Sequence, residues 1–134
     1  MLQPKRTKFK KSFKVSKKLK GVQRTQLSFG KFGIQAKKPS SLSSKGIETI
    51  RRILSRHLKR KGQVWIRIFP KVPVTSKPAE VRMGKGKGSV DHWVVPIQAG
   101  QILFEMDGIP LNIAKEACTI AQYRLSFPIS FVTK

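Results

Sequence analysis

The stretch from Gly84 to Ser89 is the part of the sequence most suited to chemistry, because glycine alternates there with lysine. Glycines expose backbone N–H groups and let a phosphate approach closely, and lysine side chains add positive charge. The stretch lacks a Gly-Lys-Ser/Thr sequence at P-loop spacing, and it precedes an expected strand rather than a helix. We therefore expect contact with polynucleotide phosphates here, and not nucleotide hydrolysis.

Residues that could perform catalysis or bind a metal are few and scattered. His57 and His92 lie 35 positions apart, and neither has neighbours at a metal-ligand spacing. We expect His57 on the flank of a helix, as a candidate contact to phosphate. Glu105 and Asp107 share one face of a strand and are expected to be structural acids. No group combines an acid, a base and an oxyanion site, so the sequence predicts no enzyme, no metal and no cofactor.

Positive charge dominates the composition, since 29 Lys and Arg stand against 6 Asp and Glu and give a net charge of +23. Such a chain repels itself unless a polyanion neutralises it. Residues 1–87 hold 26 of the basic residues, and Lys5 to Lys20 holds nine of them around Phe9 and Phe13. Cations interleaved with rings suit binding along RNA, and we expect this segment to be disordered until an anion orders it. A merely solvated tail is the alternative.

The rest of the composition indicates one folded domain. The 134 residues, 39% of them apolar, suffice for one core. Cys118 is the sole cysteine, which excludes an intramolecular disulfide and indicates a reducing compartment. No stretch approaches the roughly 20 apolar residues of a membrane helix. Residues 1–47 are basic and contain no acid, so an organelle transit peptide is an alternative for the N-terminus.

One amphipathic helix is predicted between residues 44 and 61. Its apolar stripe is Ile47, Ile50, Leu54 and Leu58. Ser43 or Ser44 is expected to cap its start and Gly62 to end it. The opposite face is basic and is expected to bind RNA rather than only water. That face consists of Lys45, Arg52, Arg56, Lys59 and Arg60.

Alternating apolar residues predict strands on either side of this helix. The first spans residues 27–36 with a bend at Gly30, and the second spans residues 63–69. Residues 90–97 and 101–106 are predicted to pair as a hairpin, with an edge or bulge at Pro96.

The proline- and serine-rich stretches at residues 37–44 and 71–79 are predicted to be loops. Pro110 opens a second helix, with Ile113, Ala117, Ile120 and Ala121 on one face, and residues 127–133 form a last strand. The fold class is therefore α+β, an antiparallel or mixed sheet with two helices, preceded by a basic N-terminal extension. The expected division is an RNA-threading extension at 1–26 and a single domain at 27–134, with a mobile basic loop near 77–89.

Seven segments together resemble a known family over nearly the whole chain. They are MLQPKRTKF, SFGKFGIQA, the helix with Arg51 and Arg52, WIRIFP, KPAEVRMGKGKG, GQILFEMDG and FVTK. In this order they resemble bacterial-type large-subunit ribosomal protein sixteen, and WIRIFP with VRMGKGKG is the most specific pair. Because the resemblance begins at Met1, the basic N-terminus resembles mature family sequence rather than a transit peptide.

The resemblance implies an α/β-hammerhead-like fold and structural binding to large-subunit rRNA around the aminoacyl-tRNA site, where the family supports the tRNA elbow and joins late in assembly. The loop implied to point toward tRNA and the peptidyl-transferase region is Arg82, Met83, Gly84, Lys85, Gly86 and Lys87. Arg82 is a candidate for hydroxylation. The implied partners are large-subunit rRNA, aminoacyl-site tRNA and neighbouring ribosomal proteins, without a membrane span or homo-oligomer.

The residues expected to bind rRNA are the cations of the extension and of the first helix. They are Lys5, Arg6, Lys8, Lys10, Lys11, Lys14, Lys17, Lys18, Lys20, Arg51, Arg52, Arg56, Lys59 and Arg60. The sequence departs from common bacterial members of the family at residues 12–27 and at Gly46. Its residue choices elsewhere resemble those of mitochondrial members, which favours a mitochondrial matrix protein over a bacterial cytoplasmic one. Two other classes stay open: a non-specific nucleic-acid-compacting protein, and a basic hydrolase or nuclease.

Overall fold

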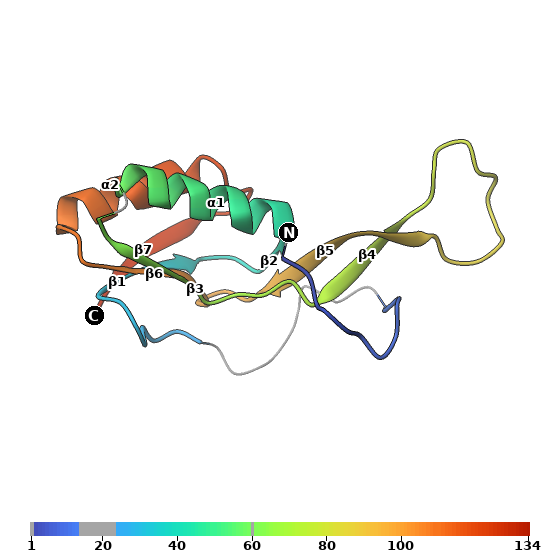
Figure 1. The fold of residues 1–134 in the computed structure, drawn as a ribbon, viewed down its shortest axis with the longest axis horizontal. Coiled ribbons are helices and arrows are strands. Elements are labelled where there is room, and N and C mark those ends of the chain that lie inside the picture. Colours follow the sequence, from blue (N-terminus) through green and yellow to red (C-terminus); the bar gives the residue numbers. More distant parts are fainter. Residues whose placement is uncertain (1, 14–23, 60) are drawn as a thin grey trace.

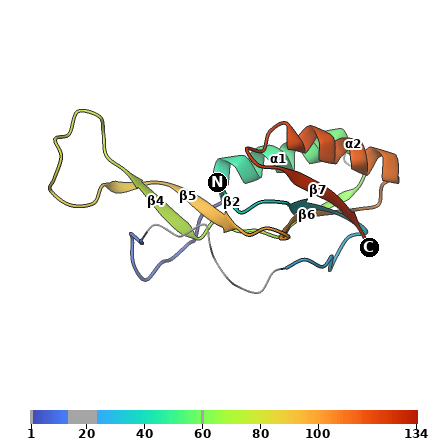
Figure 2. The same ribbon diagram turned by 180° about the vertical axis from the view of Figure 1, so that it is seen from behind.

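The computed structural model describes residues 2–13, 24–59 and 61–134, and within them it has two antiparallel sheets and two helices (Figures 1 and 2). The elements are β1 (Phe32–Ala36), β2 (Ser40–Ser43), α1 (Ser44–His57), β3 (Gln63–Ile66), β4 (Val72–Ser76), β5 (Ser89–Ile97), β6 (Ile102–Asp107), α2 (Leu111–Gln122) and β7 (Ile129–Thr133). One sheet has the strand order β3-β6-β1-β7, and the other has the order β2-β5-β4. The predicted α+β class with two helices is confirmed.

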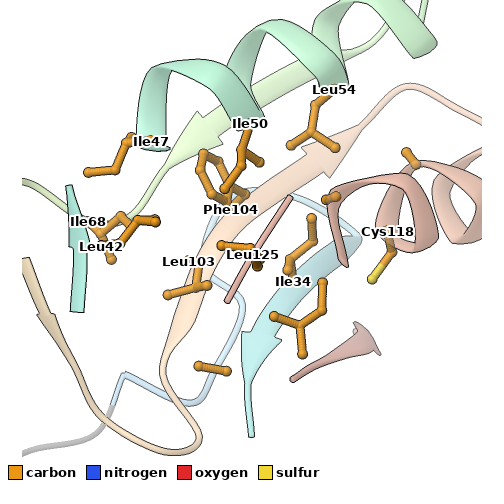
Figure 3. Close-up of a cluster of buried hydrophobic side chains, with 14 of the residues drawn as sticks. Ile34, Leu42, Ile47, Ile50, Leu54, Ile68, Leu103, Phe104, Cys118 and Leu125 are labelled. Carbon is orange, nitrogen blue, oxygen red and sulfur yellow. The ribbon is translucent and has the colours of Figure 1, made fainter. Parts of the chain in front are cut away.

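The core lies between the four-stranded sheet and the two helices, which run side by side over one face of that sheet (Figures 1 and 2). Ile47, Ile50 and Leu54 of α1 are buried, as their spacing predicted. They pack toward Phe104 of β6 and Ile34 of β1, both without exposed surface (Figure 3). The apolar stripe thus fixes which face of α1 is left for other partners.

Both ends of α1 were predicted, one of them wrongly. The Ser43 side chain accepts a hydrogen bond from the Gly46 N–H at 3.1 Å, which confirms the N-cap. The helix ends at His57, before a left-handed Lys59 with φ 49°, and not at Gly62. A Cβ on Gly62 would lie 2.8 Å from the Asp107 carbonyl oxygen, so this glycine is needed for close packing against β6.

The helix α2 buries a face that is rotated from the predicted one. Its buried residues are Ala114, Ala117, Cys118 and Ala121, whereas Ile113 is 36% exposed and Ile120 half-buried. Small side chains on the inner face let the helix approach its neighbours closely, and the larger isoleucines are left at the edge of the contact. Burial raises the pKa of the Cys118 thiol, which packs on this face as a small apolar side chain.

The predicted hairpin between residues 90–97 and 101–106 is wrong in its pairing, although both strands exist. β5 belongs to the three-stranded sheet and β6 to the four-stranded sheet. The turn at Gln98–Gln101 carries the chain from one sheet to the other, because Gly100 donates to the Ala36 carbonyl at 2.7 Å and Ala36 donates to the Gln101 carbonyl at 3.0 Å. Gly100 has φ 82°, which glycine adopts without strain.

Two predicted loops are in fact the strands that flank β5. β2 lies within residues 37–44 and β4 within residues 71–79, and each pairs antiparallel with β5. Proline fits in β4 because β4 is an edge strand. Pro96 lies in the central strand opposite Ser41, beyond the end of β4, so its missing N–H breaks no pairing on that side. The bulge lies instead near Val74 and Thr75.

Residues 27–30, just before β1, lie against the sheet face away from the helices, and a buried carboxylate holds this covering segment in place. Glu105 has no exposed surface and accepts backbone hydrogen bonds from Ser28 at 3.1 Å, Phe29 at 2.7 Å and Gly30 at 2.9 Å. It also accepts a bond from the Arg67 guanidinium, which is itself only 13% exposed. Glu105 is thus a structural acid, as expected from its position.

Two neighbouring contacts support the same covering segment. The ring of Phe29 stacks on Trp65 with centroids 6.1 Å apart, and the Arg67 guanidinium lies 5.1 Å from the Phe29 centroid. Trp65 and Gly33 are the two strand partners of Glu105, so these side chains share one face. A Cβ on Gly33 would lie 2.4 Å from Leu27, so the absence of a side chain lets Leu27 lie against the sheet.

Burial alone would raise the pKa of Glu105, but its hydrogen bonds have the larger effect. The N–H groups of Gly30, Phe29 and Ser28, together with Arg67, hold the pKa below the usual 4.5. Ionised Glu105 therefore stabilises the fold at pH values above about 4.5, and this contribution is lost as the pH falls through the lowered pKa.

Replacing the Glu105 carboxylate tests how much it contributes to the stability of the fold. Glu105→Gln should lower the free energy of unfolding by about 3 kcal/mol, because it leaves the mostly buried Arg67 without its counter-charge. Asp107→Asn is the matched control, because among the described residues Asp107 accepts a hydrogen bond only from the adjacent Gly108 N–H at 2.7 Å, and it should cost less than about 1 kcal/mol. Urea unfolding measures both, and equal losses would contradict the role given to Glu105.

The contribution of Glu105 should also be visible in how the stability of the protein depends on pH. Between about pH 7 and about pH 3 the wild-type protein should lose more stability than Glu105→Gln, which has no carboxylate to protonate. Glu48→Gln should retain most of the wild-type dependence, because its partners Arg51 and Arg52 are 43% and 72% exposed and water screens the pair. Thermal unfolding at a series of pH values distinguishes the three proteins, and parallel curves would refute the assignment.

Candidate nucleic-acid interface

The glycine-rich loop lies at the tip of the long β4–β5 hairpin, which extends away from the body of the molecule (Figures 1 and 2). Every residue from Lys77 to Lys87 is exposed, and the Met83 side chain is 97% exposed. Gly84, Lys85 and Gly86 have φ values of 94°, 56° and 81°. The loop therefore turns through three left-handed residues, which alternating glycines make possible.

The charge of this loop is strongly positive. Arg82, Lys85 and Lys87 are exposed there, and Glu80 is the only acid between residues 77 and 88. The ammonium group of Lys77 contacts the Gly84 carbonyl across the loop. The six residues predicted as a tRNA-facing loop, Arg82 to Lys87, are thus brought together on one projecting tip.

The outer face of α1 is a second basic surface, separate from the hairpin tip. Arg52 and Arg56 are exposed on it, Lys45 lies at its start, and the exposed Lys59 follows the end of the helix. Glu48 contacts Arg51 at 2.6 Å and Arg52 at 3.1 Å. These two arginines hold the pKa of Glu48 at about 2, so the pair stays ionised and part of the predicted charge is offset within the helix.

The N-terminal segment is a third basic surface, and the structure places it against the hairpin. Lys5, Arg6, Lys8, Lys10 and Lys11 are all exposed. The predicted contacts Lys14, Lys17, Lys18, Lys20 and Arg60 lie outside the described residues.

The contact between the segment and the hairpin is reciprocal. The Lys11 ammonium donates to the Lys87 carbonyl at 2.7 Å, and the Lys87 ammonium contacts the Ser12 carbonyl. Residues more than 70 positions apart are thereby joined at the neck of the hairpin. Two of the three predicted RNA-binding surfaces therefore form one continuous surface.

Sequence reasoning missed Lys71 and Trp93, which lie near that junction. Both line a cavity between the N-terminal segment and β4. They were missed because residues 71–79 were predicted to be a loop, although Val72 and Val74 alternate as they do in a strand. Trp93 lies directly opposite Pro73 in the β4–β5 pairing.

The histidines lie apart from these surfaces. His57 faces α2, where its Nε2 lies 3.4 Å from a Glu116 carboxylate oxygen, so the expectation of a phosphate contact is not supported. His92 lies 2.8 Å from Asp91 on the hairpin. Within residues 2–13, 24–59 and 61–134, no three His, Cys, Asp or Glu side chains gather as a metal site. In the same part of the chain, no helix is long and apolar enough to cross a membrane.

Comparison with known proteins identifies the family. The family model described as ribosomal protein L16p/L10e matches residues 4–132. The chain belongs to this family. It is 51% identical over 136 residues to the large ribosomal subunit protein uL16 of Azorhizobium caulinodans, and 50% identical over 134 residues to that of Aeromonas hydrophila. Each alignment covers 100% of this chain and 98% of the relative.

Membership in the L16p/L10e family makes the protein a structural constituent of the large ribosomal subunit, with rRNA and other ribosomal proteins as partners. The predicted family resemblance is confirmed. These two relatives are bacterial, so they give no support to the expectation of a mitochondrial protein, whereas a bacterial cytoplasm agrees with them.

The neck of the hairpin depends on Gly88, which is separated from Gly86 by one residue. A Cβ on Gly88 would lie 2.4 Å from the Ser76 carbonyl oxygen, whereas nothing lies within 4 Å of one on Gly86. Gly88→Ala should therefore open the Ser76–Ser89 end of the β4–β5 pairing and speed amide hydrogen exchange there roughly tenfold or more. Gly86→Ala, the control, should strain only the tip. Equal exchange in the two variants would show that the neck tolerates the extra atom.

Proposed function

We propose that the protein binds large-subunit rRNA around the aminoacyl-tRNA site, positions tRNA through its hairpin loop and helps complete subunit assembly. The observation that supports this most directly is the β4–β5 hairpin, which holds a glycine-rich, cationic tip away from the body (Figure 1). A tip that contributes nothing to the core is free to contact a second molecule while the body stays bound to the first.

The division of roles follows from where the charge lies. The N-terminal extension, residues 1–26, and the outer face of α1 would neutralise rRNA phosphates, and the domain at 27–134 would support the loop at 77–89. Arg24, near the C-terminal end of the extension, accepts a hydrogen bond through its carbonyl from the Ile102 N–H at 2.9 Å. This end of the extension is therefore fixed to the start of β6. Binding through phosphates predicts an affinity that falls steeply with salt.

The loop itself combines charge with an exposed apolar side chain. Arg82, Lys85 and Lys87 can contact tRNA or rRNA phosphates, and Met83 offers an apolar surface to a ribose or base face. The same exposure leaves Arg82 accessible for modification, and we propose it as the candidate hydroxylated residue. A mitochondrial location stays a prediction without support from the relatives, and no homo-oligomer is proposed.

The two lysines of the loop test the proposed contact with tRNA. Large subunits reconstituted with Lys85→Ala/Lys87→Ala should bind tRNA at the aminoacyl site roughly tenfold more weakly, because two exposed cations are lost near a polyanion. Far-UV circular dichroism should show an unchanged fold, since the loop buries little.

A charge-matched control separates loop position from net charge. Lys37→Ala/Lys38→Ala removes two exposed lysines between β1 and β2 and should leave tRNA affinity within about twofold. Equal losses in both double variants would indicate a general charge effect and favour a non-specific nucleic-acid-compacting protein. Such a protein would also bind duplex DNA as tightly as rRNA at the same salt concentration.

A further inference from the structure

A cavity of about 840 Å³ lies between the N-terminal segment and the base of the β4–β5 hairpin. Its walls come from residues 7–13 on one side and from residues 71–73, Lys87 and Trp93 on the other. Figure 1 shows this segment, in dark blue, running below β4. The cavity is open to solvent, since Phe13 in its wall is 93% exposed, and its volume falls within the roughly 300–1,000 Å³ of sites that hold a ligand the size of a nucleotide.

The lining of the cavity is positively charged. Lys8, Lys11, Lys71 and Lys87 line it, and no acidic side chain does. The groups that Lys11 and Lys87 contact are backbone carbonyls, which do not cancel their charge. An anionic ligand would therefore be attracted from several sides, and one with two phosphates could contact lysines on both walls.

Aromatic rings line the same cavity. Phe9 and Phe13 belong to its N-terminal wall and are 72% and 93% exposed, although burial of such rings is favourable. Trp93 belongs to the hairpin wall. Lys8 lies 5.5 Å from the centroid of the Phe9 ring, so ring and cation are available at the same place. Rings beside lysines match the needs of an unpaired base, which stacks, and of its phosphates, which pair with cations.

We propose that this cavity binds one unstacked nucleotide of single-stranded RNA, with its base against the aromatic rings and its flanking phosphates on the lysines. The proposal rests on the proposed binding to rRNA and specifies the form of RNA that this surface takes. Because the two walls come from the N-terminal segment and the hairpin, one bound nucleotide would link them and restrict the hairpin at its base.

The experiment is a binding titration of the full-length protein carrying Trp65→Phe, in which Trp93 is the remaining tryptophan. One ligand is a short single-stranded oligoribonucleotide, and the other is an abasic oligonucleotide of the same length and charge. The base-containing strand should quench Trp93 fluorescence and bind roughly tenfold more tightly than the abasic strand, because stacking on rings requires a base. Equal binding of the two strands without quenching would overturn the proposal.

Ring variants without a charge change complete the test. Phe9→Ala/Phe13→Ala should reduce affinity for the base-containing strand roughly tenfold, leave affinity for the abasic strand unchanged and keep the same salt dependence. Tyr123→Ala is the matched control, since Tyr123 is an 80% exposed ring at the end of α2 outside the cavity, and it should change neither affinity.

The outcome for the nucleotide site is distinguishable from that for rRNA binding as a whole. The Phe9→Ala/Phe13→Ala variant and the Tyr123→Ala control could bind the base-containing strand with equal affinity while the protein still sediments with large subunits. The cavity proposal would then fail and the proposed function would stand. If the wild-type protein binds neither strand and no large-subunit rRNA, both fail. Tight binding of an apolar peptide in the cavity, without binding of the single strand, would assign the cavity to a neighbouring protein instead.

Discussion

A carboxylate with no exposed surface, Glu105, determines how the chain enters the folded domain. An ionised group in that position is tolerated only where donors surround it, and here three consecutive backbone N–H groups and a guanidinium do so. Those N–H groups belong to Ser28, Phe29 and Gly30, which follow the basic extension. The requirement of one buried charge for donors thus holds residues 28–30, just before β1, against the sheet face that the helices leave uncovered.

The same arrangement separates the parts that fold from the parts that bind. The helices cover one face of the four-stranded sheet, and residues 27–30 lie against the other face beside Glu105 and Gly33 (Figures 1 and 2). The three-stranded sheet extends beyond that core as the β4–β5 hairpin. Most of the basic residues consequently lie on surfaces that contribute little to the core, and charge repulsion among them costs the fold little.

Local patterns predicted the elements whose stability is local. The stripe of α1, its Ser43 cap and the alternation in β5 and β6 are visible in the sequence because neighbouring residues determine them. The pairing of β4 with β5 could not be predicted, since Pro73 suggested a loop although an edge strand accepts proline. Glu105 could be predicted as structural, but its backbone donors lie 75 or more positions earlier and Arg67 lies 38 positions earlier, so only the folded sheet brings them together.

The same limit of sequence-based prediction applies to the candidate interface, where a local loop could be predicted and a site built from distant segments could not. The loop at residues 82–87 could be predicted because glycine and lysine alternate there within a few positions. The cavity beside Trp93 could not be predicted, because it forms only where the N-terminal segment meets β4, and the prolines around β4 had led to the prediction of a loop. Charge is a property of composition and indicates RNA in general, whereas selectivity for one form of RNA requires rings and cations held at fixed positions around a shared space. In this chain, Lys11 and Lys87 contact each other across that space, and both residues line it.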